Sequence, residues 1–94
     1  MTKPISVGYV VASDFIQGAG TTPEEAWESA VAALATDGVE ILPRGSTVPA
    51  NGKVAYPDQL ETLPATADLL ANIDRAGVRD SGWLVVDGIA CRRV

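Results

Sequence analysis

The sequence predicts an α+β fold in which two helices pack on one antiparallel or mixed sheet. Three features of the 94 residues indicate this fold: a strand pair at the start, two segments with helical spacing of apolar residues, and a hairpin at the end. The predicted order of elements is β-β-α-β-(loop or ribbon)-α-β-β, and we expect a sandwich of two layers. The length fits a single domain covering residues 1–94.

Residues 5–12 are rich in β-branched and aromatic side chains, which favour a strand. Ser13-Asp14 is turn material, and residues 15–17 are predicted as a short returning strand. The segment 18–20, Gly-Ala-Gly, would end that strand as a tight turn. The first element is therefore predicted to be an antiparallel hairpin.

The strongest local signals for a helix lie in residues 23–37. Thr22 is a candidate N-cap, Pro23 stands at the first helical position, and Glu25 completes a T-x-x-E capping box. Gly38 can end the helix in a left-handed conformation. Apolar residues at helical spacing predict a face that packs on the sheet: Ala26, Trp27, Ala30, Val31 and Leu34.

Residues 39–42 are predicted as a strand, and a Pro/Gly-rich loop follows at 43–64 with four of the six prolines. The dipeptide Asn51-Gly52 favours a type I′ turn. Residues 47–50 and 53–56 are therefore predicted to form a short ribbon, which Pro49 would confine to an edge. Tyr56 is the aromatic residue that we expect to be exposed as a binding anchor.

A second helix is predicted over residues 65–76, with Thr66 as its cap and Gly77 as its terminator. Its expected buried stripe consists of Leu69, Leu70, Ile73 and Ala76.

The chain then predicts a hairpin, because residues 82–86 and 89–94 flank the two-residue turn Asp87-Gly88. Val94 would end the chain on an edge strand. Paired edges are a common route to dimers, so a homodimer is one expected form of the protein.

The absence of histidine and the single Cys91 exclude most catalytic and metal-binding arrangements. Neither a Ser-His-Asp nor a Cys-His couple can form, and one cysteine cannot supply a four-cysteine metal site. Cys91 is expected to be a buried strand residue, and Asp80 and Asp87 to lie in turns. We therefore expect no enzyme activity, no catalytic residue, no cofactor and no metal.

The net charge of −5 argues against attraction to nucleic acid or to an anionic membrane. Residues 14–40 contain six acids and no base, which predicts a docking face for a protein with a basic surface. The helix macrodipole favours acids such as Glu24, Glu25 and Glu28 near a helix start, so a merely solvating role stays open for these three. It does not explain Asp37 and Glu40. The candidate binding residues are Glu24, Glu25, Glu28, Asp37, Glu40 and Tyr56.

No segment is typical of a signal peptide, and no apolar run approaches the length of a membrane span. With one cysteine and no export signal, the cytoplasm is the expected location.

Residues 20–34, G-T-T-P-E-E-A-W-E-S-A-V-A-A-L, follow a short hairpin and resemble the strand-to-helix motif of HicB-type antitoxin domains. This resemblance implies a toxin-neutralising module.

Three segments, 18–27, 63–70 and 83–91, are together similar to small proteins of phages and prophages, among which are the anti-CRISPR inhibitors. That resemblance implies an inhibitor that occupies a basic channel or docking site on a host defence complex. The leading expectation is therefore a non-enzymatic phage-type protein that inhibits a CRISPR effector complex by protein–protein contact. The alternative is a degenerate HicB-like antitoxin.

Overall fold

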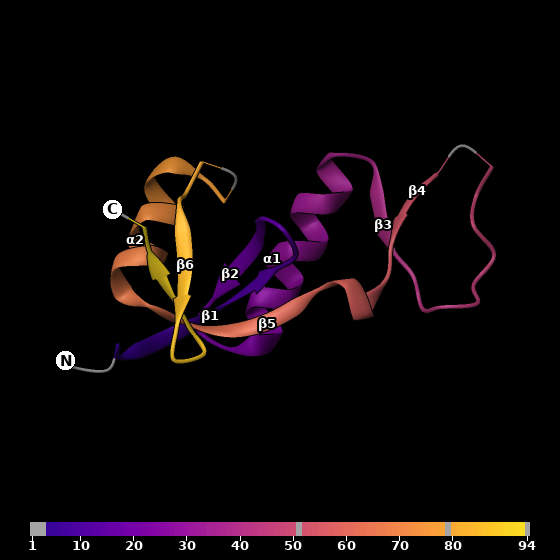
Figure 1. Ribbon diagram of the computed structural model, residues 1–94. Coiled ribbons are helices and arrows are strands. Elements are labelled where there is room, and N and C mark those ends of the chain that lie inside the picture. The colour runs from indigo at the N-terminus through magenta and orange to yellow at the C-terminus, as the bar shows by residue number, and fades with distance from the viewer. Residues whose placement is uncertain (1–3, 51, 79, 94) are drawn as a thin grey trace.

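The computed structural model describes residues 4–50, 52–78 and 80–93, and its α+β architecture confirms the predicted fold class (Figure 1). Two helices accompany a mixed five-stranded sheet of order β2-β1-β5-β7-β6 and a separate parallel pair, β3-β4. The molecule measures 50 × 24 × 20 Å. The elements in chain order are β1 (Ser6–Ala12), β2 (Ile16–Gly20), α1 (Pro23–Thr36), β3 (Val39–Ile41), β4 (Lys53–Ala55), a short 3-10 turn η1 (Pro57–Gln59), β5 (Glu61–Thr66), α2 (Ala67–Ala76), β6 (Trp83–Val86) and β7 (Ile89–Arg92).

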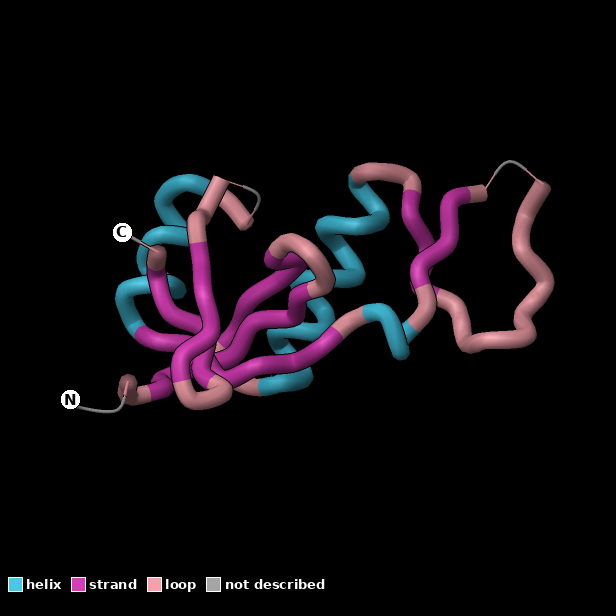
Figure 2. Tube along the Cα trace, viewed as in Figure 1, coloured by secondary structure: helices cyan, strands magenta, loops and turns pink. Residues whose placement is uncertain are grey.

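The helices cover opposite faces of the large sheet, so the domain has three layers where two were predicted (Figure 2). Neighbouring residues of β1 show this directly, because successive side chains of a strand point to opposite faces. Val10 is fully buried in the cluster that contains Leu69 of α2, whereas Val11 is fully buried against Ala26 and Ala30 of α1. β1 is thus the strand on which both halves of the core are built.

Gly18 and Gly20 belong to β2 and are not the turn that the sequence predicts. Both face α1, which lies so close that side chains would not fit. A Cβ at Gly18 would stand 2.2 Å from the main-chain nitrogen of Ala30, and one at Gly20 would stand 2.6 Å from that of Ala26. The Gly-Ala-Gly segment therefore serves as the docking strip for the helix.

The start of α1 is capped as predicted at Thr22, whose hydroxyl accepts a hydrogen bond of 3.1 Å from the Glu25 amide. The Glu25 carboxylate accepts a hydrogen bond from the Thr21 hydroxyl, 3.1 Å from one of its oxygens, and not from the Thr22 amide that a full capping box requires. The helix ends at Thr36, one residue before the predicted end. Gly38 follows with a φ of +76°, as expected of a left-handed terminator.

The region predicted as loop or ribbon differs most from the structure. Residues 47–50 form no strand, and β4 pairs in parallel with β3, so the predicted ribbon is wrong. Asn51, half of its proposed turn, lies outside the described residues. β3, β4 and the chain between them form an arm beyond the C-terminal end of α1 (Figure 1).

β5 was not predicted, yet it is the central strand of the large sheet. It lies antiparallel to β1 and contains Pro64, which is rare in central strands. β7 meets β5 only at the pair Ala65–Ala90. Proline has no N–H to donate. Because Pro64 is not paired with any residue of β7, no hydrogen bond is missing on that side.

α2 begins two residues later than predicted, with the Thr66 hydroxyl accepting from the Leu69 amide at 3.4 Å. Gly77 ends it with a φ of +93°. Leu69 and Ile73 are buried as expected, but Ala76, the last residue of the helix, is exposed.

The terminal hairpin is confirmed, with Asp87 at φ +53° and Gly88 at φ +77° as a type I′ turn requires. Its strands are ordered differently from the prediction. β7 lies inside the sheet beside β5, and β6 forms the edge. Val94 lies outside the described residues, so the edge expected there is instead residues 83–86.

Within the described ranges, neither helix is long and apolar enough to cross a membrane.

Gly18→Ala should lower the free energy of unfolding by at least about 2 kcal/mol, because overpacking against fixed backbone is costly. Gly82→Ala is the matched control, since its Cβ would meet Arg93 at an ordinary 3.5 Å. The control should change the unfolding free energy by no more than about 0.5 kcal/mol. Urea denaturation measures both. Equal stability of the two variants would contradict the close approach of α1 to β2.

Candidate protein-binding surface

Three of the predicted acidic residues lie at the start of α1, and all are exposed. Glu24 and Glu25 stand in the first turn, where the helix dipole favours negative charge. Glu28 lies beyond that turn, one helical turn from Glu24 on the same side of the helix. Because the dipole effect falls off beyond the first turn, it does not account for Glu28. The like charge of Glu24 at this spacing also repels Glu28.

Asp37 and Glu40 lie at the opposite end of α1, the first as its C-cap and the second in β3. Twelve residues separate Glu25 from Asp37, which at 1.5 Å per residue is about 18 Å along the helix axis. The structure therefore does not gather the five acids into one cluster. It divides them between the two ends of α1.

An apolar groove joins these two ends, and we call it the Trp27 groove. It encloses about 590 Å³ between the outer flank of α1 and the arm. The residues that define it are Trp27, Val31, Ala35, Val39, Ile41 and Pro57. Trp27 also lines a shallower hollow that contains Glu24 and Glu28, while Glu40 borders the groove itself. Carboxylates thus bracket a continuous apolar strip.

These bracketing carboxylates face solvent without neutralisation. Among the described residues, Glu24, Glu28 and Glu40 have neither an ion-pair partner nor a hydrogen-bond partner. Glu25 differs, because its carboxylate is held by the Thr21 hydroxyl. An apolar groove with unpartnered acids at both ends matches a partner that combines aliphatic surface with positive charge.

Tyr56 is not the freely exposed anchor that the sequence predicts. Its ring is half-buried, and the Arg44 guanidinium lies over it, 4.0 Å from the ring centroid. Arg44 also donates two hydrogen bonds from Nε and Nη2 to the Asp58 carboxylate at 3.0 and 3.1 Å. This bidentate contact lowers the pKa of Asp58 and raises that of Arg44. Tyr56 is therefore partly covered by Arg44, and its role as a binding anchor stays a prediction.

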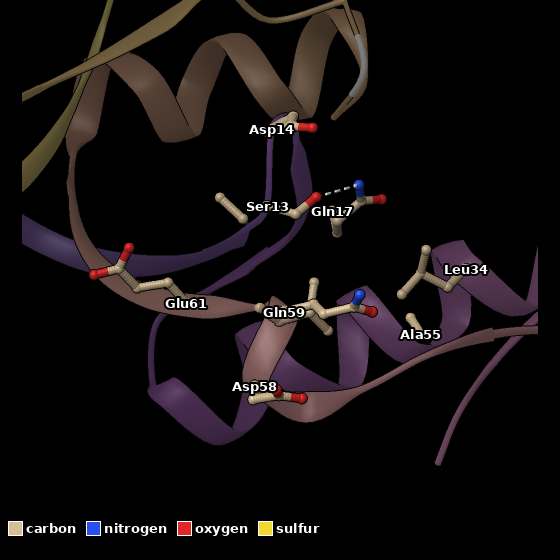
Figure 3. Close-up of a pocket in the computed structure, with 10 residues that line it drawn as sticks. Ser13, Asp14, Gln17, Leu34, Ala55, Asp58, Gln59 and Glu61 are labelled. Carbon is tan, nitrogen blue, oxygen red and sulfur yellow. Dashed lines mark hydrogen bonds between the residues drawn. The ribbon is translucent and has the colours of Figure 1, made fainter. Parts of the chain in front are cut away.

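A second, polar groove of about 720 Å³ lies between the β1–β2 turn and the η1 region (Figure 3). Gln17 donates to the Ser13 hydroxyl at 3.3 Å, and Figure 3 shows the carboxylates of Asp14, Asp58 and Glu61 on different sides of this space. Across the part of the chain that the structure describes, no three His, Cys, Asp or Glu side chains come together to hold a metal ion. This groove has no arrangement that favours a particular ligand.

The other candidate residues from the sequence, Cys91, Asp87 and Asp80, lie in or just before the terminal hairpin. Cys91 is half-buried in β7, with its thiol donating to the carbonyl of Ile89 at 3.4 Å. Asp87 forms the hairpin turn, and Asp80 is exposed just before β6.

Sequence reasoning missed the apolar half of the Trp27 groove. Trp27 and Val31 are predicted to face the core. Trp27 does pack against the buried cluster on the α1 side, but it is only half-buried, and Val31 is 41% exposed. The sequence does contain a signal for this surface. The apolar stripe of the first helix is wider than contact with one sheet requires. Pro57 could not have been assigned to this surface, because it reaches α1 only through the parallel pairing of the arm.

Comparison of the chain with protein-family models, with curated proteins and with solved structures finds no match.

Arg44→Gln should raise the pKa of Asp58 toward its ordinary value of 3.8, because it removes the donor that holds the carboxylate ionised. In the native protein the folded-state pKa is depressed. The pair therefore stabilises the fold above the unfolded-state pKa, and this contribution is lost as the pH falls through the folded value. Carbon-13 NMR titration of the Asp58 carboxyl measures the shift. Arg92→Gln is the control and should leave that titration unchanged; an unaltered Asp58 titration in Arg44→Gln would refute the contact.

Proposed function

We propose that this protein is a non-enzymatic binding protein that docks on a basic surface of another protein or ribonucleoprotein through the Trp27 groove. The observation that carries the proposal is the apolar groove between α1 and the arm, bracketed by carboxylates without partners among the described residues. Lysine and arginine side chains fit such a site, because their stems cover apolar surface while their charged ends reach the acids.

The two parts of this surface would contribute differently to binding. Trp27 belongs to the residue types that dominate interface energies, and Val31 adds exposed apolar area beside it. The carboxylates that bracket the groove, Glu24, Glu28 and Glu40, are called the rim acids from here on. They would mainly accelerate association with a basic partner and exclude acidic partners. This division predicts a strong salt dependence of the association rate.

Within this class, we propose inhibition of a host defence complex in a bacterial cytoplasm, with a CRISPR effector as the leading partner. Such complexes expose basic channels for nucleic acid, and an acidic surface can occupy them by charge complementarity. The protein itself would bind no nucleic acid directly and no membrane, in line with its net charge of −5.

The alternative is a HicB-like antitoxin or toxin-neutralising module. A specific observation favours it: the hairpin of β1 and β2 leads directly into the capped start of α1, in the order that the resemblance implies. In this case the partner would be a small toxin and not a ribonucleoprotein.

Homodimerisation through strand edges also belongs to the proposal. In the large sheet the two edge strands are β2 and β6, and β7 is internal.

Reversing the three rim charges by Glu24→Lys, Glu28→Lys and Glu40→Lys should reduce binding to the partner by at least about tenfold, because attraction becomes repulsion. The matched control is Asp14→Lys, Glu61→Lys and Asp74→Lys. It makes the same change in net charge at exposed acids elsewhere and should retain binding.

Each form would serve as bait in a bacterial lysate, and the captured proteins would be identified and their association rates measured. Loss of a ribonucleoprotein with the rim variant alone supports the inhibitor, and loss of a toxin supports the antitoxin. Equal capture by both triple variants would refute the acidic rim.

A further inference from the structure

β6 is an open sheet edge built entirely from apolar residues. Its sequence is Trp-Leu-Val-Val, and Leu84, Val85 and Val86 are 42%, 49% and 36% exposed. Edge strands are usually protected by charge, proline, bulges or a covering segment. β6 contains neither charge nor proline, and its register with β7 is regular throughout.

The opposite edge of the sheet is protected in a way that β6 is not. At β2, the Ala19 amide donates to the Ser29 hydroxyl of α1 at 3.1 Å, so the helix covers main-chain groups there. α1 packs on β2 and β1, while α2 lies under β7. Among the described residues, neither helix supplies a hydrogen bond to β6.

The hydrogen-bond pattern of the hairpin shows which main-chain groups of β6 point outward. The Arg93 amide donates to the carbonyl of Gly82 at 3.0 Å, so these residues bond across the hairpin. Antiparallel pairs alternate between bonded and non-bonded positions. Leu84 therefore bonds toward β7, and the main-chain groups of Trp83 and Val85 point away from the sheet.

Charge selects the direction of an added strand. Asp87 stands at one end of β6, in the hairpin turn. At the other end, Arg92 pairs with Trp83 and Arg93 follows it, and these two bases outnumber Asp80, the exposed acid just before β6. An antiparallel copy of β6 brings the acidic end of each chain beside the basic end of the other. A parallel copy would place like charges together.

We propose that β6 pairs with β6 of a second copy of this chain, antiparallel and about a two-fold axis perpendicular to the sheet. Such an axis keeps each residue on the same sheet face in both copies. Trp83 of each chain then exchanges main-chain hydrogen bonds with Val85 of the second copy. Leu84 lies beside Leu84 of the second copy, with the axis between them. The two five-stranded sheets then form one continuous sheet.

The side chains are suited to this arrangement. Trp83 packs against the α2 side of the core, and Val85, which pairs with fully buried Ala90, shares that face. Trp83 would therefore contact Val85 across the interface as an aromatic–β-branched cross-strand pair. On the other face, the two Leu84 side chains would meet at the close spacing of a non-bonded pair. Edge pairing buries little area, so the dimer should be weak.

This inference rests on the homodimerisation named under the proposed function and specifies its interface. Because that interface lies on the strand edge and not in the Trp27 groove, its failure can be distinguished from a failure of partner binding in the groove. Sedimentation of the whole chain from about 5 µM to about 1 mM covers the range expected of a weak dimer. The native chain should shift from its 9.8 kDa monomer toward twice that mass as concentration rises.

The decisive variants are Leu84→Lys and Leu84→Glu, which place like charges together on the axis. Each alone should weaken dimerisation at least about tenfold, and an equimolar mixture of the two should restore it. Leu84 is exposed, so circular dichroism should show that both variants remain folded. Val31→Lys is the control, because it alters the Trp27 groove and should leave dimerisation intact.

Three results would overturn the proposal: a native chain that stays monomeric at every concentration, Leu84 variants that dimerise as well as the native chain, or a mixture that fails to restore association. Loss of partner binding in Val31→Lys with an intact dimer would show that the two surfaces are independent. Loss of the dimer in Val31→Lys would place the interface in the groove and refute the role of β6.

Discussion

The close contact between α1 and β2 is the constraint on which the rest of the structure depends. Gly18 and Gly20 have no side chains, and Ala26 and Ala30 are fully buried opposite them, so the helix backbone lies almost directly on the strand. The helix therefore contacts the strand mainly through small residues, and of its larger ones Leu34 is buried while Trp27 packs only in part against the core. Trp27 and Val31 can then form a surface on its outer flank. The candidate binding groove is thus a consequence of how closely the opposite side of α1 is packed.

The three-layer arrangement places the Trp27 groove and the open strand edge on different parts of the molecule. Because α1 and α2 lie on opposite faces, each leaves part of the sheet uncovered, and the open edge at β6 lies on the far side of the sheet from β2. The arm extends the other flank of α1 and is held there by the exposed Arg44–Asp58 pair and the ring of Tyr56. One surface is therefore a groove bordered by carboxylates, while the other is an apolar strand edge. These properties suit different kinds of partner.

Local signals predicted most of the elements, and long-range pairing explains where prediction stopped. Thr22-Pro23 and Asp87-Gly88 act within a few residues, so the first helix and the last hairpin were predictable. The five candidate acids are exposed as expected, but their division between the ends of α1 follows from helix length. β5 was missed because Pro64 argues against a strand when its neighbours are unknown. The run from Gly8 to Ala12, apolar at nearly every position, indicates a strand buried on both faces, and the two-layer prediction overlooked that pattern.

The position of β5 has a consequence for how the chain acquires its fold. β1 pairs with β2 only a few residues away, but its other neighbour arrives more than fifty residues later, where Val10 meets Leu63. Closing so long a segment costs entropy before any contact compensates for it, and topologies dominated by such pairings fold slowly. During synthesis, the hairpin and α1 would leave the ribosome with Val10 still exposed to water. The first half of the chain must therefore wait for the second, and its apolar strand is vulnerable to non-native pairing in that interval.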